Sequence, residues 1–185
     1  DVVHKGFEEE FIKNISEIAE PEKIKHVILN HLEPDHSGSI EYMAKVLKNA
    51  KFYGTAKLKE GLLKYYNLDI DITVVKTGDK INLGNNTLTF IEVPMVHWPD
   101  SMMTYCPEQK VLFSNDGFGQ HIATNKTFTD EVDCGIIDKE VAKYYANILW
   151  PLGAMIDRSI NNILKMNLPI DFIAPSHGLV WRKDI

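Results

Sequence analysis

Asn30-His31-Leu32-Glu33-Pro34-Asp35-His36-Ser37-Gly38 carries the densest chemical signal in the chain. It places four possible metal ligands within six residues, namely His31, Glu33, Asp35 and His36. A short β-rich run, residues 24–30, leads into it, and a segment with apolar residues at helical spacing, residues 40–47, follows. A turn between a strand and a helix is free of the alternation that sends neighbouring strand residues to opposite faces, so it can direct several side chains to one point. Taken alone, the stretch is either a polar surface loop or a metal-binding turn.

Three later residues occur in the same context and favour the metal-binding interpretation. His97 follows the predicted strand 87–93, Asp116 follows the strand 111–114, and His177 follows the strand 170–174. A chain that places His or Asp just past the ends of four strands describes one rim of a layered sheet, where a metal site can be assembled. The sequence therefore predicts a metal centre that combines these three residues with the four of the opening stretch.

The rest of the chain alternates helical and strand-like patterns. Apolar residues at helical spacing predict a helix over 7–19, which Pro21 ends, and Ser37 or Ser39 is the expected cap of the helix over 40–47. Thr55 is the expected cap of a helix that runs to Tyr66. Gly84-Asn85-Asn86 predicts a hairpin, and further strands and helices are expected over 51–53, 72–75, 81–83, 102–106, 141–148 and 152–163. Alternating units followed by hairpins predict an α/β layered sandwich.

Composition limits the class of protein. The 185 residues, 44% of them hydrophobic, suit one globular domain over residues 1–185. The net charge of -6, with both signs mixed along the chain, argues against a nucleic acid as a partner. No apolar run reaches the roughly 18 residues that a membrane span needs. Cys106 and Cys134 form no paired motif, so a reducing cytoplasm is expected, although the chain opens on Asp1 and targeting stays open.

The order His31-x-Glu33-x-Asp35-His36, then His97, Asp116 and His177, resembles the metallo-β-lactamase superfamily over nearly the whole chain. That superfamily usually has His-x-His-x-Asp-His, and a carboxylate in place of the second His resembles the flavodiiron (A-type flavoprotein) family. Three further blocks also resemble that family: residues 96–101, Val-His-Trp-Pro-Asp-Ser; residues 113–121, Phe-Ser-Asn-Asp-Gly-Phe-Gly-Gln-His; and residues 175–178, Pro-Ser-His-Gly.

The resemblance implies a fold, a ligand set and partners. The fold would be a metallo-β-lactamase-like αββα sandwich that lacks its first strands in this chain. Of two bridged non-haem iron ions, one would be held by His31, Glu33 and His97, the other by Asp35, His36 and His177, with Asp116 between them. His36 is the least secure member, and its other role is to orient a carboxylate or a water.

The same resemblance implies that the chain reduces dioxygen to water or nitric oxide to nitrous oxide. Electrons would come from FMN in a flavodoxin-like domain that this chain lacks, and from a donor such as rubredoxin. A homodimer, or an assembly with a companion chain, is implied because the family places the flavin of one subunit opposite the metal site of another.

Charge offers an independent argument for iron. Glu33, Asp35 and Asp116 supply three negative charges against four positive charges of two divalent ions, and a bridging hydroxide would neutralise the rest. The usual hydrolase motif has one carboxylate fewer and so gives a stronger Lewis acid. The extra carboxylate favours a metal that visits the ferric state. A dizinc hydrolase of the same superfamily is the alternative, and a metal-binding domain without activity is the third possibility.

Several neighbours of these residues have open roles. Trp98 either walls the metal pocket or belongs to the ordinary core. His121 either supports a ligand or is solvated. Three further residues, Asp100, Ser114 and Asn115, are expected to be able to hydrogen-bond metal ligands.

Overall fold

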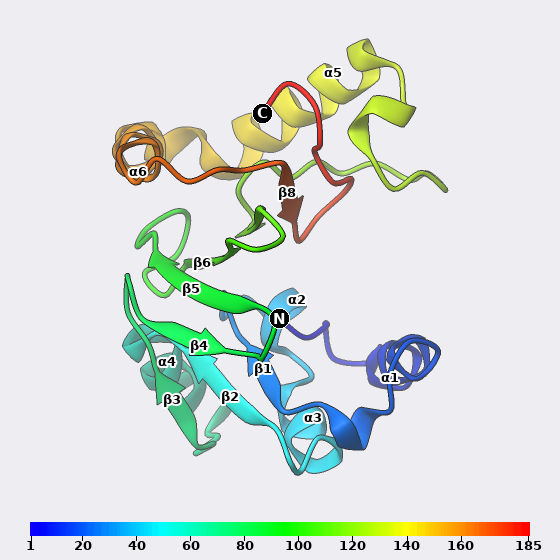
Figure 1. Cartoon of the computed structure of the whole chain (residues 1–185), viewed down its shortest axis with the longest axis vertical. Coiled ribbons are helices and arrows are strands. Elements are labelled where there is room, and N and C mark those ends of the chain that lie inside the picture. Colours follow the sequence, from blue (N-terminus) through cyan, green and yellow to red (C-terminus); the bar gives the residue numbers. More distant parts are fainter. The chain divides into compact units, whose positions relative to one another are not determined.

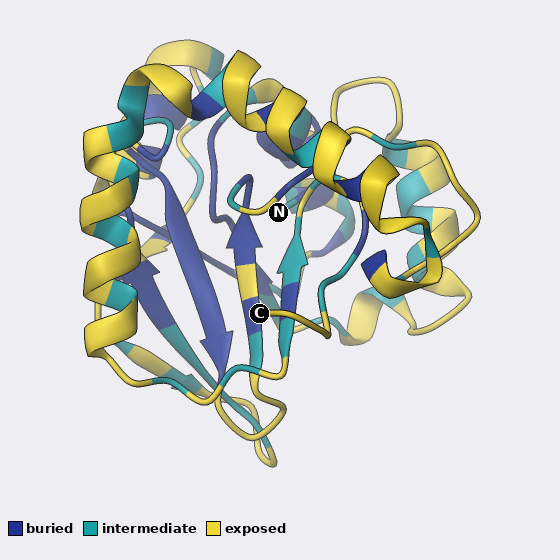
Figure 2. Cartoon of the chain, turned by 90° about the horizontal axis from the view of Figure 1, so that it is seen from above, coloured by how far each residue is buried: buried dark blue, intermediate teal, exposed yellow.

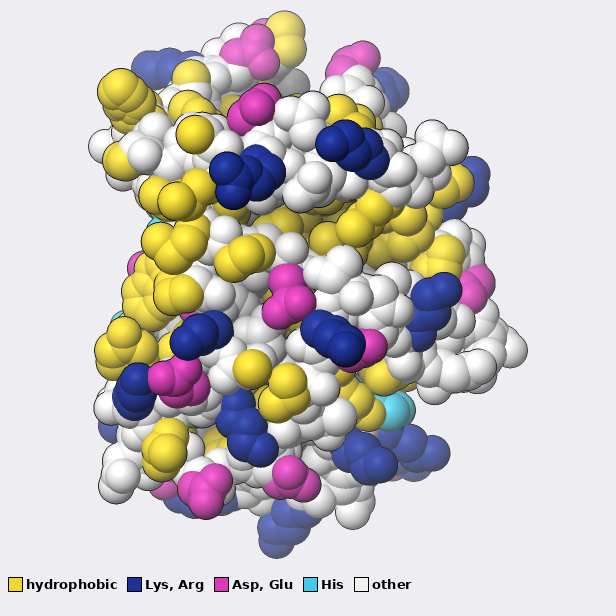
Figure 3. Space-filling view, turned by 90° about the vertical axis from the view of Figure 1, so that its left-hand side faces the viewer, with side chains coloured by type: hydrophobic (Ala, Val, Ile, Leu, Met, Phe, Trp, Pro, Cys, Tyr) yellow, Lys and Arg dark blue, Asp and Glu magenta, His cyan; other side chains and the backbone are white.

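The computed structural model describes all residues from Asp1 to Ile185, in two compact units, Asp1–Val75 and Lys76–Ile185. The expectation that residues 1–185 form one domain stays a prediction. No helix in the structure is both long enough and apolar enough to cross a membrane. On the face drawn in Figure 3, Lys and Arg side chains are interspersed with Asp and Glu over most of the surface, and a few Lys or Arg side chains adjoin one another at the lower right.

The first unit contains a parallel three-stranded sheet in the order β1-β2-β3. Parallel strands need long crossover connections, and the helices between them supply these (Figure 1). In chain order the elements are α1 (Glu8–Ser16), the 3-10 turn η1 (Pro21–Lys23), β1 (His26–Ile28), α2 (Pro34–Ser37), α3 (Ile40–Val46), β2 (Lys51–Gly54), α4 (Ala56–Tyr66) and β3 (Ile72–Val74).

Local chemistry explains how the helices of this unit begin and end. The Thr55 hydroxyl accepts a hydrogen bond from the Leu58 amide, which confirms Thr55 as the cap of α4. Asn67, in the left-handed conformation, ends α4. Ser39 occupies the position before α3, but its hydroxyl accepts from the Val3 amide and does not cap the helix. The predicted helix over 7–19 is three residues too long at its end, because α1 stops at Ser16.

The second unit contains a five-stranded sheet in the order β4-β5-β6-β7-β8, antiparallel except for the parallel pair β7–β8. Its elements are β4 (Lys80–Asn82), β5 (Thr87–Glu92), β6 (Met102–Cys106), β7 (Val111–Asn115), the 3-10 turn η2 (Thr129–Glu131), α5 (Cys134–Tyr144), the π-helical turn η3 (Tyr145–Leu149), the 3-10 turn η4 (Trp150–Leu152), α6 (Gly153–Lys165) and β8 (Phe172–Pro175). The hairpin predicted at Gly84-Asn85-Asn86 is confirmed, with Gly84 at a positive φ of 94°. The strands β6 and β7 form a further antiparallel pair.

The core of the second unit lies between the sheet and α6. Ile91, Met103 and Leu112 form part of a buried cluster, against which Ile156 and Ile163 of α6 pack. Strands are largely buried and helices keep an exposed outer face in Figure 2. The helix predicted from residue 141 starts at Cys134, where the Asp133 side chain accepts from the Gly135 amide. Periodicity missed this first part because the cap, not an apolar face, starts the helix.

Candidate metal centre

In the first unit, the predicted ligands follow β1 as two adjacent pairs. Nε2 of His31 lies 3.3 Å from Oε2 of Glu33, and Nε2 of His36 lies 3.4 Å from Oδ2 of Asp35. The two imidazole rings are 5.0 Å apart between centroids. Both histidines are buried, whereas Glu33 and Asp35 are partly exposed. The unit therefore presents two neighbouring imidazole–carboxylate pairs, which can supply donors to two metal ions.

The segment predicted as a loop contains the one-turn helix α2, which carries Asp35 and His36. Pro34 stands at its first position, where a missing amide hydrogen costs nothing and the fixed φ suits a helix. The Ser37 hydroxyl donates to the Leu32 carbonyl, and the same Ser37 hydroxyl lies 3.0 Å from the Tyr66 hydroxyl. These contacts hold the backbone of the turn in place, and so they position the side chains of Asp35 and His36.

Asp1 is a positioning residue that the sequence did not reveal. Its Oδ1 accepts hydrogen bonds from the amides of Asn30, at 2.6 Å, and His31, at 3.2 Å, and its Oδ2 lies 3.5 Å from Nδ1 of His36. A carboxylate beside one ring nitrogen sets the tautomer and directs the other nitrogen toward a metal. No local pattern marks Asp1, because its partners lie about thirty residues away in sequence.

In the second unit, Asp116 lies between two histidines. Its Oδ2 is 3.1 Å from Nε2 of His97, and its Oδ1 is 3.4 Å from Nε2 of His177. The Asp116 side chain is 2% exposed. Each oxygen of one carboxylate therefore serves a different imidazole, as a carboxylate that bridges two metal ions would.

The parallel pair β7–β8 brings Asp116 and His177 together. Asn115, the last residue of β7, adopts a positive φ of 58° beside an irregularity in the register, and its carbonyl accepts from the Ser176 amide at 2.8 Å. Asn and Asp tolerate this left-handed conformation better than most residues do. That Asn115 and Ser114 hydrogen-bond metal ligands stays a prediction: the Asn115 carbonyl accepts from the Ser176 amide, and the Ser114 hydroxyl donates to the Gly117 carbonyl.

Gln120 joins the loops that carry Asp116 and His177. Its fully buried amide accepts from the Leu179 amide at 2.6 Å and donates to the Leu179 carbonyl at 3.1 Å, as a neighbouring strand would. A Cβ on Gly178 would lie 1.8 Å from Oε1 of Gln120, and Gly178 has a positive φ of 86°. Only glycine fits here, which explains the Ser176-His177-Gly178 sequence. The buried glutamine was also missed at the sequence level.

His97, Trp98 and His121 complete the surroundings of Asp116 and His177. The Trp98 ring meets the His97 ring edge-on, with 6.3 Å between the ring centroids. The backbone amide of Trp98 donates to the Ser101 hydroxyl. His121 is exposed, and its ring lies 5.5 Å from His177 and 4.9 Å from Tyr144. The exposed His121 ring thus meets the His177 and Tyr144 rings edge-on, and Trp98 adjoins His97.

The donor chemistry of both units fits a metal ion. In the first unit, two imidazole–carboxylate pairs supply donors, at His31, Glu33, Asp35 and His36, and in the second unit one carboxylate lies between two imidazoles, at His97, Asp116 and His177. A buried carboxylate such as Asp116 is costly unless positive charge neutralises it, and here its close neighbours are imidazoles. Mixed imidazole and carboxylate donors suit iron, zinc and manganese better than calcium or magnesium.

Residues 4–178 match the model of the family described as ODP family beta lactamase. The chain belongs to the ODP beta-lactamase family. Among its relatives, the nitric oxide reductase of Moorella thermoacetica is 46% identical over all of the chain and 46% of the relative's length. The anaerobic nitric oxide reductase flavorubredoxin of Vibrio vulnificus is 40% identical over all of the chain and 38% of its own length.

Solved structures show the same likeness to this ODP-family chain. The rubredoxin oxygen:oxidoreductase of Desulfovibrio gigas matches with a TM-score of 0.95 and 32% identity, over 98% of the chain and 46% of that protein. The flavodiiron protein of Giardia intestinalis matches with a TM-score of 0.93 and 39% identity, over 100% of the chain and 45% of that protein. The expected metallo-β-lactamase-like fold and the resemblance to flavodiiron proteins are confirmed. The chain spans less than half the length of these relatives.

Proposed function

We propose that this ODP-family chain holds two non-haem iron ions and reduces nitric oxide to nitrous oxide or dioxygen to water. His31, Glu33 and His97 would bind one ion, Asp35, His36 and His177 the other, and Asp116 would bridge them. The observation that carries the proposal is the placement of the two Asp116 oxygens against two different histidines. The names of the relatives, nitric oxide reductase and rubredoxin oxygen:oxidoreductase, support the reaction class.

When bound, the two ferrous ions supply one electron each, which matches two nitric oxides plus two electrons and two protons giving nitrous oxide and water. Reduction of dioxygen to two waters takes up four electrons and four protons, which a reduced donor would have to supply. The residues of the chain position the proposed ligands. Asp1 and Gln120 hold ligand-bearing loops in place, and the buried histidines keep their rings fixed in orientation.

Electrons come, on this proposal, from FMN in a flavodoxin-like domain and from a rubredoxin-type donor, within a homodimer or an assembly with a companion chain in the cytoplasm. Two relatives carry flavorubredoxin or flavodiiron in their names, which supports a flavin partner. The dizinc hydrolase is less favoured, because the relatives are named as reductases and Glu33 adds a carboxylate to the usual motif.

Metal content and gas consumption test the proposal together. The holoprotein should contain about two iron ions per chain, as a bridged pair requires, and consume nitric oxide or dioxygen with a reduced flavoprotein donor. His177→Ala should lose iron, whereas the exposed His4→Ala, a matched control, should not. Two zinc ions with hydrolysis of thioesters or phosphodiesters would establish the hydrolase instead. Absence of bound metal would leave only a binding domain.

A further inference from the structure

An apolar cavity of about 160 Å³ lies in the second unit, between the α5–η3 segment, α6 and the loop after β7. Its inner end is formed by buried side chains, among them Val96, Met103 and Leu149. Its rim includes Phe118 and Ile160, which are 40% and 41% exposed. The lining is almost entirely apolar. The cavity therefore has both buried and solvent-exposed apolar side chains in its wall.

Each metal-ligand position of this unit has a neighbour in the cavity wall. Val96 directly precedes His97, and Gly117 directly follows Asp116. The Tyr144 ring, also in the wall, lies 6.2 Å from the His177 ring. A Cβ on Gly119 would come within 3.0 Å of the Tyr144 ring, so glycine lets this ring pack on the loop after Asp116. The cavity wall thus includes residues of the loops that carry His97 and Asp116, and a ring that lies near His177.

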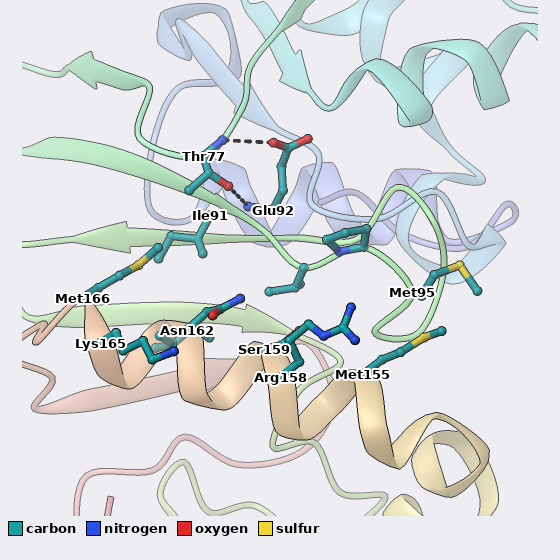
Figure 4. Close-up of a pocket in the computed structure, with 13 residues that line it drawn as sticks. Thr77, Ile91, Glu92, Met95, Met155, Arg158, Ser159, Asn162, Lys165 and Met166 are labelled. Carbon is teal, nitrogen blue, oxygen red and sulfur yellow. Dashed lines mark hydrogen bonds between the residues drawn. The ribbon is translucent and has the colours of Figure 1, made fainter.

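The chemistry of the lining selects the occupant. Water in a cavity must find two to four polar partners, and an apolar cavity of similar size stays dry and takes up small apolar molecules or xenon. The larger groove between β5 and α6, about 560 Å³, is different, because Arg158, Lys165 and Glu92 stand along it (Figure 4). Charged side chains retain water, so that groove does not favour an uncharged gas.

We propose that the 160 Å³ cavity binds a small uncharged diatomic gas, nitric oxide or dioxygen, and delivers it to the side of the Asp116 loop. The delivery step rests on the proposed function, whereas the capacity to bind a gas rests on the cavity alone. Partition from water into the apolar interior raises the local concentration of gas and keeps competing water away from the ligands.

Xenon is the probe for the binding step. Crystals of the holoprotein under xenon pressure should show xenon in the cavity, and Val141→Phe, which fills it from α5, should remove that xenon. Ile136→Phe is the matched control, because Ile136 is an exposed residue of the same helix outside the cavity. Xenon at no position in the cavity of the unaltered protein would overturn the proposal, whatever the activity.

Gas kinetics test the delivery step. In rapid-mixing experiments, Val141→Phe should lower the second-order rate constant for nitric oxide and for dioxygen by roughly tenfold, with iron content and Ile136→Phe unaffected. If Val141→Phe removes the xenon but changes neither rate constant, the cavity does not deliver gas to the Asp116 loop. If Val141→Phe does not fold, Leu149→Ala enlarges the cavity and should raise xenon occupancy; unchanged occupancy would contradict the proposal. An iron-loaded protein that binds xenon but consumes neither gas would refute the proposed function and leave the binding step standing.

Discussion

Oδ2 of Asp1 lies 3.5 Å from Nδ1 of His36. The other ring nitrogen, Nε2, is the one that lies near Asp35, at 3.4 Å. A histidine held at Nδ1 by a carboxylate presents Nε2 as its ligand atom, with increased basicity. This relationship favours His36 as a metal ligand over a role in which it only orients its neighbours.

Asp1→Asn should weaken metal binding at the His36 position by roughly 10- to 100-fold, as substitutions behind ligating histidines do. The amide keeps one oxygen for the Asn30 and His31 amides, but it lacks the charge that faces His36. Competition with a chelator measures the affinity, and the exposed Asp69→Asn is the control. Equal affinities in the two variants would show that Asp1 does not position His36.

Asp116→Asn should lower gas consumption more than Trp98→Phe, by about tenfold or more relative to it. A bridging carboxylate serves both metal ions, whereas the Trp98 ring only meets His97 edge-on. Steady-state consumption of nitric oxide or dioxygen is the measurement. Equal losses in two fully metallated variants would contradict the bridging assignment.

Glu33→His should move metal preference toward zinc, because it removes an anionic oxygen donor and restores the usual hydrolase motif. Competitive loading with ferrous iron and zinc, followed by elemental analysis, measures the ratio. Glu22→His changes an exposed residue of η1 and controls for the added imidazole. Unchanged selectivity in Glu33→His would count against the charge argument.

Gln120→Leu should destabilise the protein, since it removes the acceptor and the donor that face the Leu179 backbone. A buried group left without its partner costs about 1–3 kcal/mol. Gly178→Ala should also destabilise, because its Cβ would meet the Gln120 side chain and backbone. Thermal unfolding measures both, with the exposed Gln109→Leu as the control. Melting temperatures equal to that of the control would show that the hydrogen bonds between Gln120 and Leu179 do not stabilise the protein.

Acid should loosen the segment after His177 from the η2 turn. The Lys183 ammonium and the Arg182 guanidinium lower the pKa of Asp130, and the Phe128 and Thr127 amides lower the pKa of Glu131. Carboxyl groups with lowered pKa values stabilise the folded state above their ordinary range and lose this contribution as pH falls through the folded-state pKa. The protection factor of the Val180 amide against hydrogen exchange, which corrects for the slower intrinsic exchange in acid, should fall below about pH 4, because this amide donates to the Thr127 carbonyl. Asp130→Asn combined with Glu131→Gln should remove that pH dependence; if the dependence persists, other groups cause it.

Much of the fold was predictable because its signals are local. The Thr55 cap, the hairpin glycine at 84 and the positions of the ligands past strand ends each depend on a few neighbouring residues. Asp1 and Gln120 were not predictable, because their partners are 29 and 59 residues away and neither residue type is unusual in its own segment. Contacts of that range are created by the sheet and have no sequence period.

The parallel pairing of β7 with β8 also sets the order in which the proposed ligands come together during synthesis. Asp116 and His177 become neighbours only after α5 and α6 have crossed between these strands, and His177 is the last of the seven proposed ligands along the chain. During synthesis the chain emerges from its N-terminus at about 5–20 residues per second, so the first four ligands leave the ribosome several seconds before His177. A nascent chain therefore lacks one of the proposed ligands throughout that interval, and the proposed two-iron site can be completed only after the strand before His177 has joined the sheet.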